Sequence, residues 1–259
     1  MDKKVRIYVA AHKVAPVFGD SSYQLIHVGA ANSKIDIPNS IRDDDFEGNI
    51  SAKNGIYCEL TGLYYAWKNA ESYDILGLCH YRRYLGHHAY SLNYNKEILT
   101  SDEIVNDLQK YDIILPNAAK KAGRINGYFN TEAELSTYVP YQRIKKACEE
   151  LFPEYLNDIK QEFLTDHGCF GNIMITSKKI FSEYCDWMFS ILFKIERNII
   201  ADGGMVEPRE LGYYSEWLLN AYVKHNHLHA KHYPVCFLQN TKYFWPKYIM
   251  ERLGLTKLW

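Results

Sequence analysis

Short apolar segments alternate with longer amphipathic ones along this chain, and this alternation restricts its possible folds more than any other sequence feature. The apolar segments have the length of buried strands and lie at residues 5–10, 23–30, 73–79, 111–116 and 169–176. Apolar residues recur at helical spacing in segments 51–69, 101–110, 178–197 and 209–224. Strands that alternate with helices predict an α/β fold with a mainly parallel central sheet flanked by helices.

The chain reads as one domain. Its 259 residues, of which 47% are apolar, can fill a sizeable core, and no repeat or Pro/Ser-rich linker divides them. Residues 117–145 are rich in small and polar side chains and predict a long loop that leads into a helix.

Charge and cysteine usage limit the partners and the compartment. Thirty basic residues balance 31 acidic ones, so no nucleic-acid partner is expected. The six cysteines lie far apart without a CxxC pair, which predicts reduced core thiols. Without an export signal or a segment of membrane-spanning length, the sequence predicts a cytoplasmic protein.

The segment HYRR, residues 80–83, directly follows the apolar run YDILGLC. Ligands of open parallel sheets bind beyond the carboxyl ends of the strands, and His80, Arg82 and Arg83 stand at such an end. The two guanidinium groups can hold a diphosphate or a carboxylate through charge-assisted hydrogen bonds. In the alternative interpretation the arginines pair with Asp74 or Asp112, and His80 packs in the interior.

Glu216 is a candidate general base. It lies near the start of the helix predicted over 209–224, where its carboxylate can face a cleft and accept a proton from an attacking hydroxyl. A glutamate in the first turn that only complements the helix dipole is the alternative. Glu59, at the border of the apolar face of the helix predicted over 51–69, is either a site residue or an ordinary boundary residue.

Motifs for several other kinds of chemistry are missing from the sequence. It contains no P-loop, GxGxxG, GxSxG or HExxH motif, and no Asp-x-Asp follows a strand directly. Asp43 and Asp45 have Asp-x-Asp spacing but lie in a polar loop, where a solvated charge run is the simpler interpretation. The histidines of KHNHLHAKHYP, residues 224–234, match no familiar zinc spacing.

The end of the chain mixes basic and aromatic residues. Between residues 220 and 259, six Lys or Arg accompany Glu251 alone and are interleaved with Tyr243, Phe244, Trp245, Tyr248 and Trp259. Such a tail suits peripheral contact with an anionic membrane, and a tail that folds back on the core is the alternative.

The runs NISAKNGIYCELTGLYYAWKN, YDILGLCHYRRYL, YDIILP, HGCFGNIMITSKKIFSEYCDWMFSILFKIE and GYYSEWLLNAYV resemble a bacterial family of capsular and exopolysaccharide biosynthesis glycosyltransferases, long catalogued as a domain of unknown function. The resemblance covers nearly the whole chain. It implies a GT-A-like domain that transfers a sugar from a UDP-sugar donor, UDP-galactofuranose in some members. The acceptor would be a glycan or a polyprenyl-diphosphate-linked glycan in capsule, exopolysaccharide or O-antigen synthesis.

The resemblance also implies roles for individual residues. His80, Arg82 and Arg83 would take the place of the Asp-x-Asp motif and its metal, so that no cofactor is needed, and Glu216 would be the base of an inverting reaction. Trp217 stands where the family's helix motif has a second acid. The donor-side residues would be Ala10, His12, Lys13, Gly29, Asn49, Asn54 and Glu59, and the acceptor-side residues Asp166, His167, Gly171 and Asn172.

The resemblance divides the domain into a nucleotide-sugar half, residues 1–116, an acceptor and catalytic half, residues 117–235, and the basic aromatic tail, residues 236–259. Two other hypotheses remain open at this stage. One is a non-catalytic glycan- or nucleotide-binding module in which Glu216 is structural. The other is a transferase that depends on Mn²⁺ or Mg²⁺ bound by Asp43 and Asp45 or by the C-terminal histidines.

Overall fold

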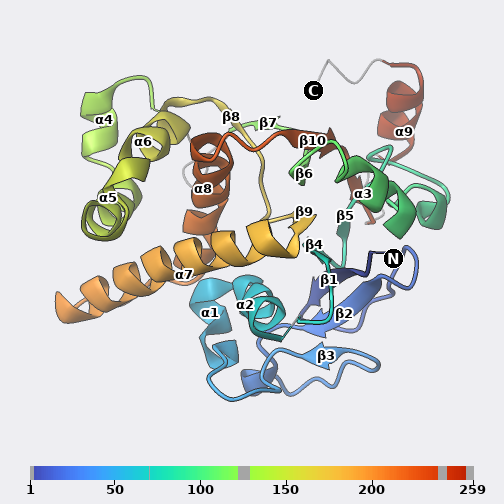
Figure 1. The fold of residues 1–259 in the computed structure, drawn as a ribbon, viewed down its shortest axis with the longest axis horizontal. Coiled ribbons are helices and arrows are strands. Elements are labelled where there is room, and N and C mark those ends of the chain that lie inside the picture. Colours follow the sequence, from blue (N-terminus) through green and yellow to red (C-terminus); the bar gives the residue numbers. More distant parts are fainter. Residues whose placement is uncertain (1–2, 70, 122–128, 239–243, 255–259) are drawn as a thin grey trace.

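A computed structural model describes residues 3–69, 71–121, 129–238 and 244–254, and a central twisted sheet organises them (Figure 1). Its main strands lie in the order β10-β6-β9-β4-β1-β2-β3. β5 extends the sheet from β4 and pairs with β11, and β7 pairs separately with β8. The strands are β1 (Val5–Ala11), β2 (Tyr23–His27), β3 (Ile41–Arg42), β4 (Ile75–His80), β5 (Arg83–Leu85), β6 (Ile113–Pro116), β7 (Ala119–Lys120), β8 (His167–Gly168), β9 (Met174–Ser177), β10 (Ala230–Tyr233) and β11 (Val235–Phe237).

The sheet is mainly parallel, as the sequence predicts. β1 runs parallel to β2 and to β4, β2 runs parallel to β3, and β6 runs parallel to β10. Among the main strands β9 is antiparallel, because it pairs in this direction with both β4 and β6, and β5 pairs antiparallel with β4 and β11. The carboxyl ends of β1, β2 and β4 therefore meet at one edge of the sheet, and the segment that enters β9 starts from the same edge.

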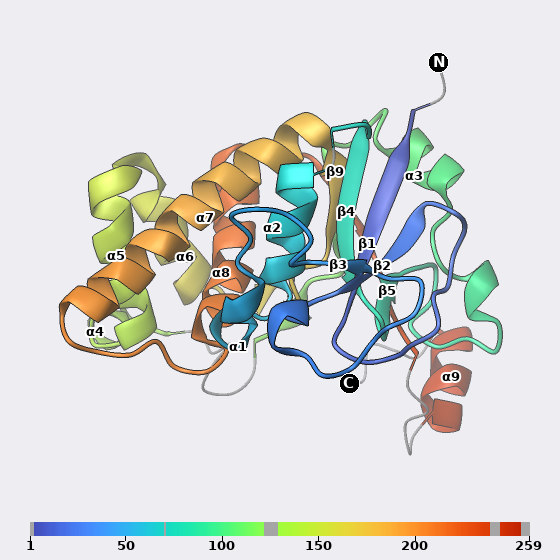
Figure 2. The same ribbon diagram turned by 90° about the horizontal axis from the view of Figure 1, so that it is seen from below.

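The helices pack on both faces of the sheet, with α2, α7 and α8 on one face and α3 on the other (Figure 2). Alternate side chains of β1 point to opposite faces of the sheet. Tyr8 and Ala10 belong to one apolar cluster, and Ile7 and Val9 belong to the other. The helices are α1 (Asn54–Tyr57), α2 (Leu60–Asn69), α3 (Ser101–Asp107), α4 (Glu132–Ser136), α5 (Val139–Leu151), α6 (Leu156–Leu164), α7 (Lys178–Ala201), α8 (Glu210–His225) and α9 (Phe244–Arg252).

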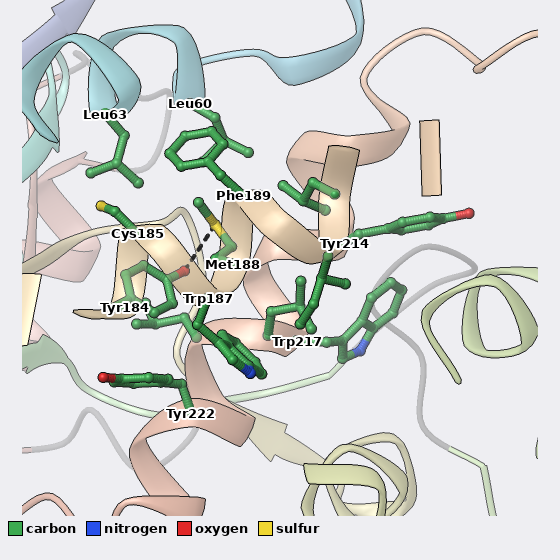
Figure 3. Packing of buried hydrophobic residues seen from close by; sticks show 14 of the residues in the cluster. Leu60, Leu63, Tyr184, Cys185, Trp187, Met188, Phe189, Tyr214, Trp217 and Tyr222 are labelled. Carbon is green, nitrogen blue, oxygen red and sulfur yellow. Dashed lines mark hydrogen bonds between the residues drawn. The ribbon is translucent and has the colours of Figure 1, made fainter. Parts of the chain in front are cut away.

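The larger cluster is rich in aromatic side chains. Tyr184, Trp187 and Met188 of α7 meet Tyr222 of α8 in its centre (Figure 3). The Trp187 and Tyr222 rings lie 5.3 Å apart, and both side chains are almost fully buried. Burial of these side chains stabilises the packing of α7 against α8, by roughly 25 cal/mol for each Å² of apolar surface removed from water. This packing fixes the position of α8.

Two predicted segments differ from the structure. The helix expected over 51–69 is interrupted, because Cys58 has φ 54° and ψ −135° and separates α1 from α2. A non-glycine residue with positive φ cannot continue a right-handed helix. The region 117–145 contains β7, α4 and the start of α5 rather than one long loop; its residues 122–128 lie outside the described part of the chain.

The acidic loop is only partly solvated. Asp45 is exposed, whereas Asp43 is fully buried. The Asp43 carboxylate accepts hydrogen bonds from the backbone N–H groups of Gly29 (2.7 Å) and Ala30 (3.0 Å) and from the Ser51 hydroxyl. Its oxygens therefore pin the turn after β2 instead of facing Asp45, which is a structural use of a buried charge.

The C-terminal histidines contact separate partners. His225 Nδ1 lies 2.9 Å from Asp158, and His232 Nδ1 lies 2.9 Å from the Pro116 carbonyl oxygen. Within the described residues, no group of three or more His, Cys, Asp or Glu side chains is arranged to hold a metal ion. All six cysteines are free thiols, as predicted, and only Cys58 is not fully buried.

The described part of the tail forms α9, which is docked on the preceding domain. The Glu251 carboxylate accepts hydrogen bonds from the backbone N–H groups of Ala89 and Tyr90, at 2.7 and 3.0 Å. Arg252 forms a salt bridge with Glu97 at 2.8 Å. Trp245 and Ile249 of α9 and Leu253, which follows it, are exposed. Membrane contact through the tail stays a prediction, and Tyr243 and Trp259 lie outside the described residues. None of the helices described has the length and apolar character needed to cross a bilayer.

Candidate functional site

A cavity of about 350 Å³ opens at the edge of the sheet where β1 and β4 end. A ligand is expected at this edge, because backbone groups and side chains of neighbouring strand ends converge there. The cavity is lined by Ala10, His12, Val28, Asn54, Gly55, Cys58, Glu59, His80, Tyr81, Arg82, Arg83, Gly171, Arg209 and Glu216.

The HYRR segment forms the turn from β4 into the antiparallel strand β5. His80, the last residue of β4, pairs with Arg83, the first residue of β5. Among the described residues, no ion pair involves Arg82 or Arg83. Asp74 instead accepts a hydrogen bond from the backbone N–H of Lys4, and Asp112 accepts one from the backbone N–H of His229, each at 2.8 Å. The alternative in which these acids neutralise the arginines is therefore wrong, and both guanidinium groups remain available to an anion in the cavity.

His80 is held by the segment that enters β9. Its Nε2 lies 2.5 Å from the carbonyl oxygen of Gly171 and 3.8 Å from Glu59 Oε1. A carbonyl oxygen only accepts hydrogen bonds, so Nε2 must carry the proton. The imidazole is thus fixed as a donor on the side of Gly171 and Glu59.

Gly171 and Asn172 orient both carboxylates of the cavity. The Gly171 N–H donates to Glu216 Oε1 at 3.1 Å, and Asn172 Nδ2 donates to Glu59 Oε1 at 2.8 Å. Both residues have positive φ, 85° and 52°, and asparagine is among the few non-glycine residues that tolerate this conformation. Ser215 of α8 donates to Asn172 Oδ1 at 2.8 Å, which ties this turn to the helix of Glu216.

Arg209 and Cys58 also line the cavity, although sequence reasoning missed both. Each is a non-glycine residue with positive φ, 66° at Arg209 and 54° at Cys58, and such backbone strain often accompanies function. Burial raises the pKa of the Cys58 thiol to about 11, and a hydrogen bond to this thiol helps to raise the pKa of Arg209. No motif marks these positions, because a left-handed conformation at Cys or Arg has no signature in the sequence.

His12 lies at the rim of the cavity beside Tyr81, with the two ring centres 5.5 Å apart. Desolvation, followed by the positive charges of Lys13 and Arg82 and by His27, lowers the pKa of His12. The neighbourhood therefore disfavours a further positive charge until an anion is present.

Six of the predicted site residues do not line the cavity. Lys13 lies over the Tyr81 ring, and the Asn49 side chain donates a hydrogen bond within its own loop. Gly29 packs so closely on Asn54 that a Cβ added to Gly29 would lie 2.7 Å from the Asn54 side chain. Asn172 lies behind the wall, with 3% of its surface exposed. Asp166 and His167 contact each other at the β7–β8 pair. Their predicted roles stay predictions.

The cavity combines an excess of positive charge with two oriented carboxylates. Arg82, Arg83 and Arg209 outnumber Glu59 and Glu216, and two histidines add further donors. Such an arrangement can bind a diphosphate, stabilise negative charge that develops on it, and remove a proton from a nearby hydroxyl.

Comparisons with known proteins give a family and a similar solved structure. A family described as a domain of unknown function, DUF4422, matches residues 6–227, which include every residue that lines the cavity. The solved apo structure of the bifunctional glycosyltransferase WbbM is 29% identical in sequence, with a TM-score of 0.77. The match covers 92% of this chain but only 46% of that chain, so this chain spans less than half of the length of WbbM. None of the curated proteins matches the chain.

Proposed function

This chain belongs to the family described as a domain of unknown function, DUF4422, and from that premise we propose that it is a glycosyltransferase that takes its sugar from a UDP-sugar. The observation that carries the proposal is the pair Arg82 and Arg83, which face the cavity at the carboxyl edge of the sheet without a carboxylate partner among the described residues. Two half-buried guanidinium groups that have no carboxylate partner among the described residues cost free energy unless an anion binds them. The similarity to a glycosyltransferase favours a nucleoside diphosphate as that anion.

In the proposed reaction Glu216 accepts the proton of an acceptor hydroxyl. The hydroxyl oxygen attacks the anomeric carbon of the donor sugar from the side opposite to the diphosphate, and the bond from this carbon to the diphosphate oxygen breaks. Its electron pair stays on the leaving UDP, where Arg82 and Arg83 stabilise the added negative charge, and His80 adds to this stabilisation when both of its ring nitrogens are protonated. The anomeric configuration is inverted. The arginines here perform the role that a divalent cation has in transferases with an Asp-x-Asp motif, so no cofactor is proposed.

The acceptor and the pathway follow from the sequence resemblance. We propose a glycan or a polyprenyl-diphosphate-linked glycan as acceptor, in the synthesis of capsule, exopolysaccharide or O-antigen. UDP-galactofuranose is the first donor to try, because the resemblance includes members that transfer galactofuranose.

The proposal is tested by thermal unfolding with UDP in the presence of EDTA or Mn²⁺, followed by transfer assays with a panel of UDP-sugars. We expect UDP to stabilise the fold in EDTA by about 2.7 kcal/mol when its concentration is a hundred times Kd. Stabilisation only with Mn²⁺ would restore the metal-dependent alternative. UDP binding without turnover of any donor would favour the non-catalytic binding module, and absence of UDP binding would refute the donor assignment.

Donor binding is expected to strengthen as the pH falls from 7.5 to 5.5. In the free protein the pKa of His12 is lowered, whereas a bound diphosphate raises it, so binding takes up a proton. Affinity therefore rises as the pH falls through the range between the two pKa values, roughly two- to tenfold for a shift of up to one unit.

Titration calorimetry with UDP-galactose measures this effect, since its diphosphate, unlike that of UDP, does not titrate in this range. His80 also lines the cavity, so the quantity to compare is the difference in pH dependence between the wild type and His12→Gln. An unchanged pH dependence in this variant would contradict the assignment.

A further inference from the structure

A second hollow, of about 230 Å³, lies between the first turn of α5 and the start of α8. We call it the aromatic cleft; the lining residues that matter here are Tyr138, Pro140, Glu207, Pro208, Tyr213 and Trp217. Rings and prolines form most of its walls, and Glu207 places an exposed carboxylate at its rim. No residue predicted from the sequence lies in this cleft.

The aromatic cleft adjoins the donor cavity. Arg209, which lines the cavity, directly follows Pro208 of the cleft, and its guanidinium carbon lies 5.2 Å from the centre of the Tyr213 ring. Glu216 lines the cavity, and the next residue, Trp217, lines the cleft. The beginning of α8 therefore contributes residues to the walls of both hollows.

The cleft is preformed by buried contacts. The carboxylate of Glu210, itself buried, accepts hydrogen bonds from the Tyr214 hydroxyl, from Arg143 and from the Glu207 N–H at 2.8 Å. Trp217 stacks on Phe163, with ring centres 4.5 Å apart and planes inclined by 27°. A rigid wall of this kind lowers the entropic cost of holding a ligand.

Trp217 belongs to the aromatic core and has 3% of its surface exposed (Figure 3). Its indole N–H has no hydrogen-bond acceptor among the described residues. A buried donor without an acceptor costs roughly 1–3 kcal/mol. Because Nε1 itself is not exposed to the cleft, a ligand there would contact the ring of Trp217 rather than its N–H.

These features fit a sugar ring better than a lipid chain. A pyranose has an apolar face of C–H groups, which packs on aromatic rings, and an edge of hydroxyl groups, which donate to carboxylates. A lipid chain would cover the Glu207 carboxylate without pairing it. We propose that the aromatic cleft binds a sugar ring of the acceptor glycan, with Tyr213 as the stacking residue. This assignment deepens the proposed transferase function and rests on it.

Saturation-transfer NMR with the methyl glycosides of galactose, glucose and mannose tests the assignment. We expect transfer to the ring C–H protons of at least one glycoside, in the presence of saturating UDP. The signal should fall at least fivefold in Tyr213→Ala, because stacking on an aromatic side chain is worth roughly 1–3 kcal/mol for a nucleobase, and 1 kcal/mol is about a factor of five in affinity. Tyr213→Phe, which keeps the ring, should retain it. UDP affinity, measured by thermal unfolding, should stay within about twofold in both variants.

Three results would overturn the assignment. They are no signal from any of the three glycosides, a signal that UDP abolishes while Tyr213→Ala leaves it unchanged, and binding of farnesyl phosphate but of no glycoside. The last result would assign the cleft to a lipid chain. Glycoside binding that depends on Tyr213, without any binding of UDP, would keep the sugar site and refute the proposed transferase, so the two failures are distinguishable.

Discussion

Replacing Glu216 by glutamine is expected to lower the rate of sugar transfer by a factor of roughly 10²–10⁴, the usual contribution of a general base. The amide cannot take the proton of the acceptor hydroxyl. Its oxygen still accepts the Gly171 N–H, which lies 3.1 Å from Glu216 Oε1, so the side chain keeps its position. UDP affinity should change by less than about threefold, because the proposed role of Glu216 is on the acceptor side. The measurements are kcat for transfer and Kd for UDP.

Glu47→Gln is the matched control, since Glu47 is an exposed glutamate that lies outside the cavity lining. It should change neither quantity. If Glu216→Gln kept more than a tenth of the wild-type rate, another group would have to be the base, and Glu59, which also lines the cavity, would be the next residue to replace.

Arg82→Ala and Arg83→Ala are each expected to raise the Kd of UDP by a factor of roughly 10–150, since hydrogen bonds to charged groups contribute about 1.5–3 kcal/mol. Arg82→Lys should recover only part of the loss, because an ammonium group keeps the charge but not the planar fork of donors. The wild-type affinity should fall as the salt concentration rises, and the salt dependence should be weaker in the alanine variants. Titration calorimetry in EDTA measures all three effects.

Lys13→Ala is the control for charge alone. Lys13 is exposed and lies over the Tyr81 ring, near the cavity but not in its wall. Its loss should change Kd by less than about threefold, as is typical of a rim charge. An unchanged Kd in both arginine variants would show that HYRR has a structural role, and the diphosphate site would have to be sought elsewhere.

The strand-end rule placed HYRR at a possible ligand site from the sequence, and the resemblance added His12. The structure brings His12, His80, Arg82 and Arg83 into one cavity with Glu59 and Glu216, and their roles stay predictions. The rule works because parallel neighbours end at the same edge of the sheet. It requires only that the strands be recognised.

Features that depend on the conformation of single residues could not be predicted. Cys58 interrupts an otherwise regular helical pattern, and Arg209 enters the cavity from a left-handed turn, yet neither residue type favours that conformation. The antiparallel direction of β9 was equally hidden, because a short buried strand has the same apolar pattern in either direction. The aromatic cleft combines α5 and α8, which are distant in sequence, so only the fold reveals it.

One turn, at Gly171 and Asn172, makes hydrogen bonds to three side chains that line the cavity. The Gly171 carbonyl oxygen positions His80, its N–H positions Glu216, and the Asn172 amide positions Glu59. The same turn thus holds both His80, beside the proposed leaving diphosphate, and Glu216, which would activate the attacking hydroxyl. A substitution that moves this turn should therefore displace the imidazole and both carboxylates at once, rather than any one of them alone.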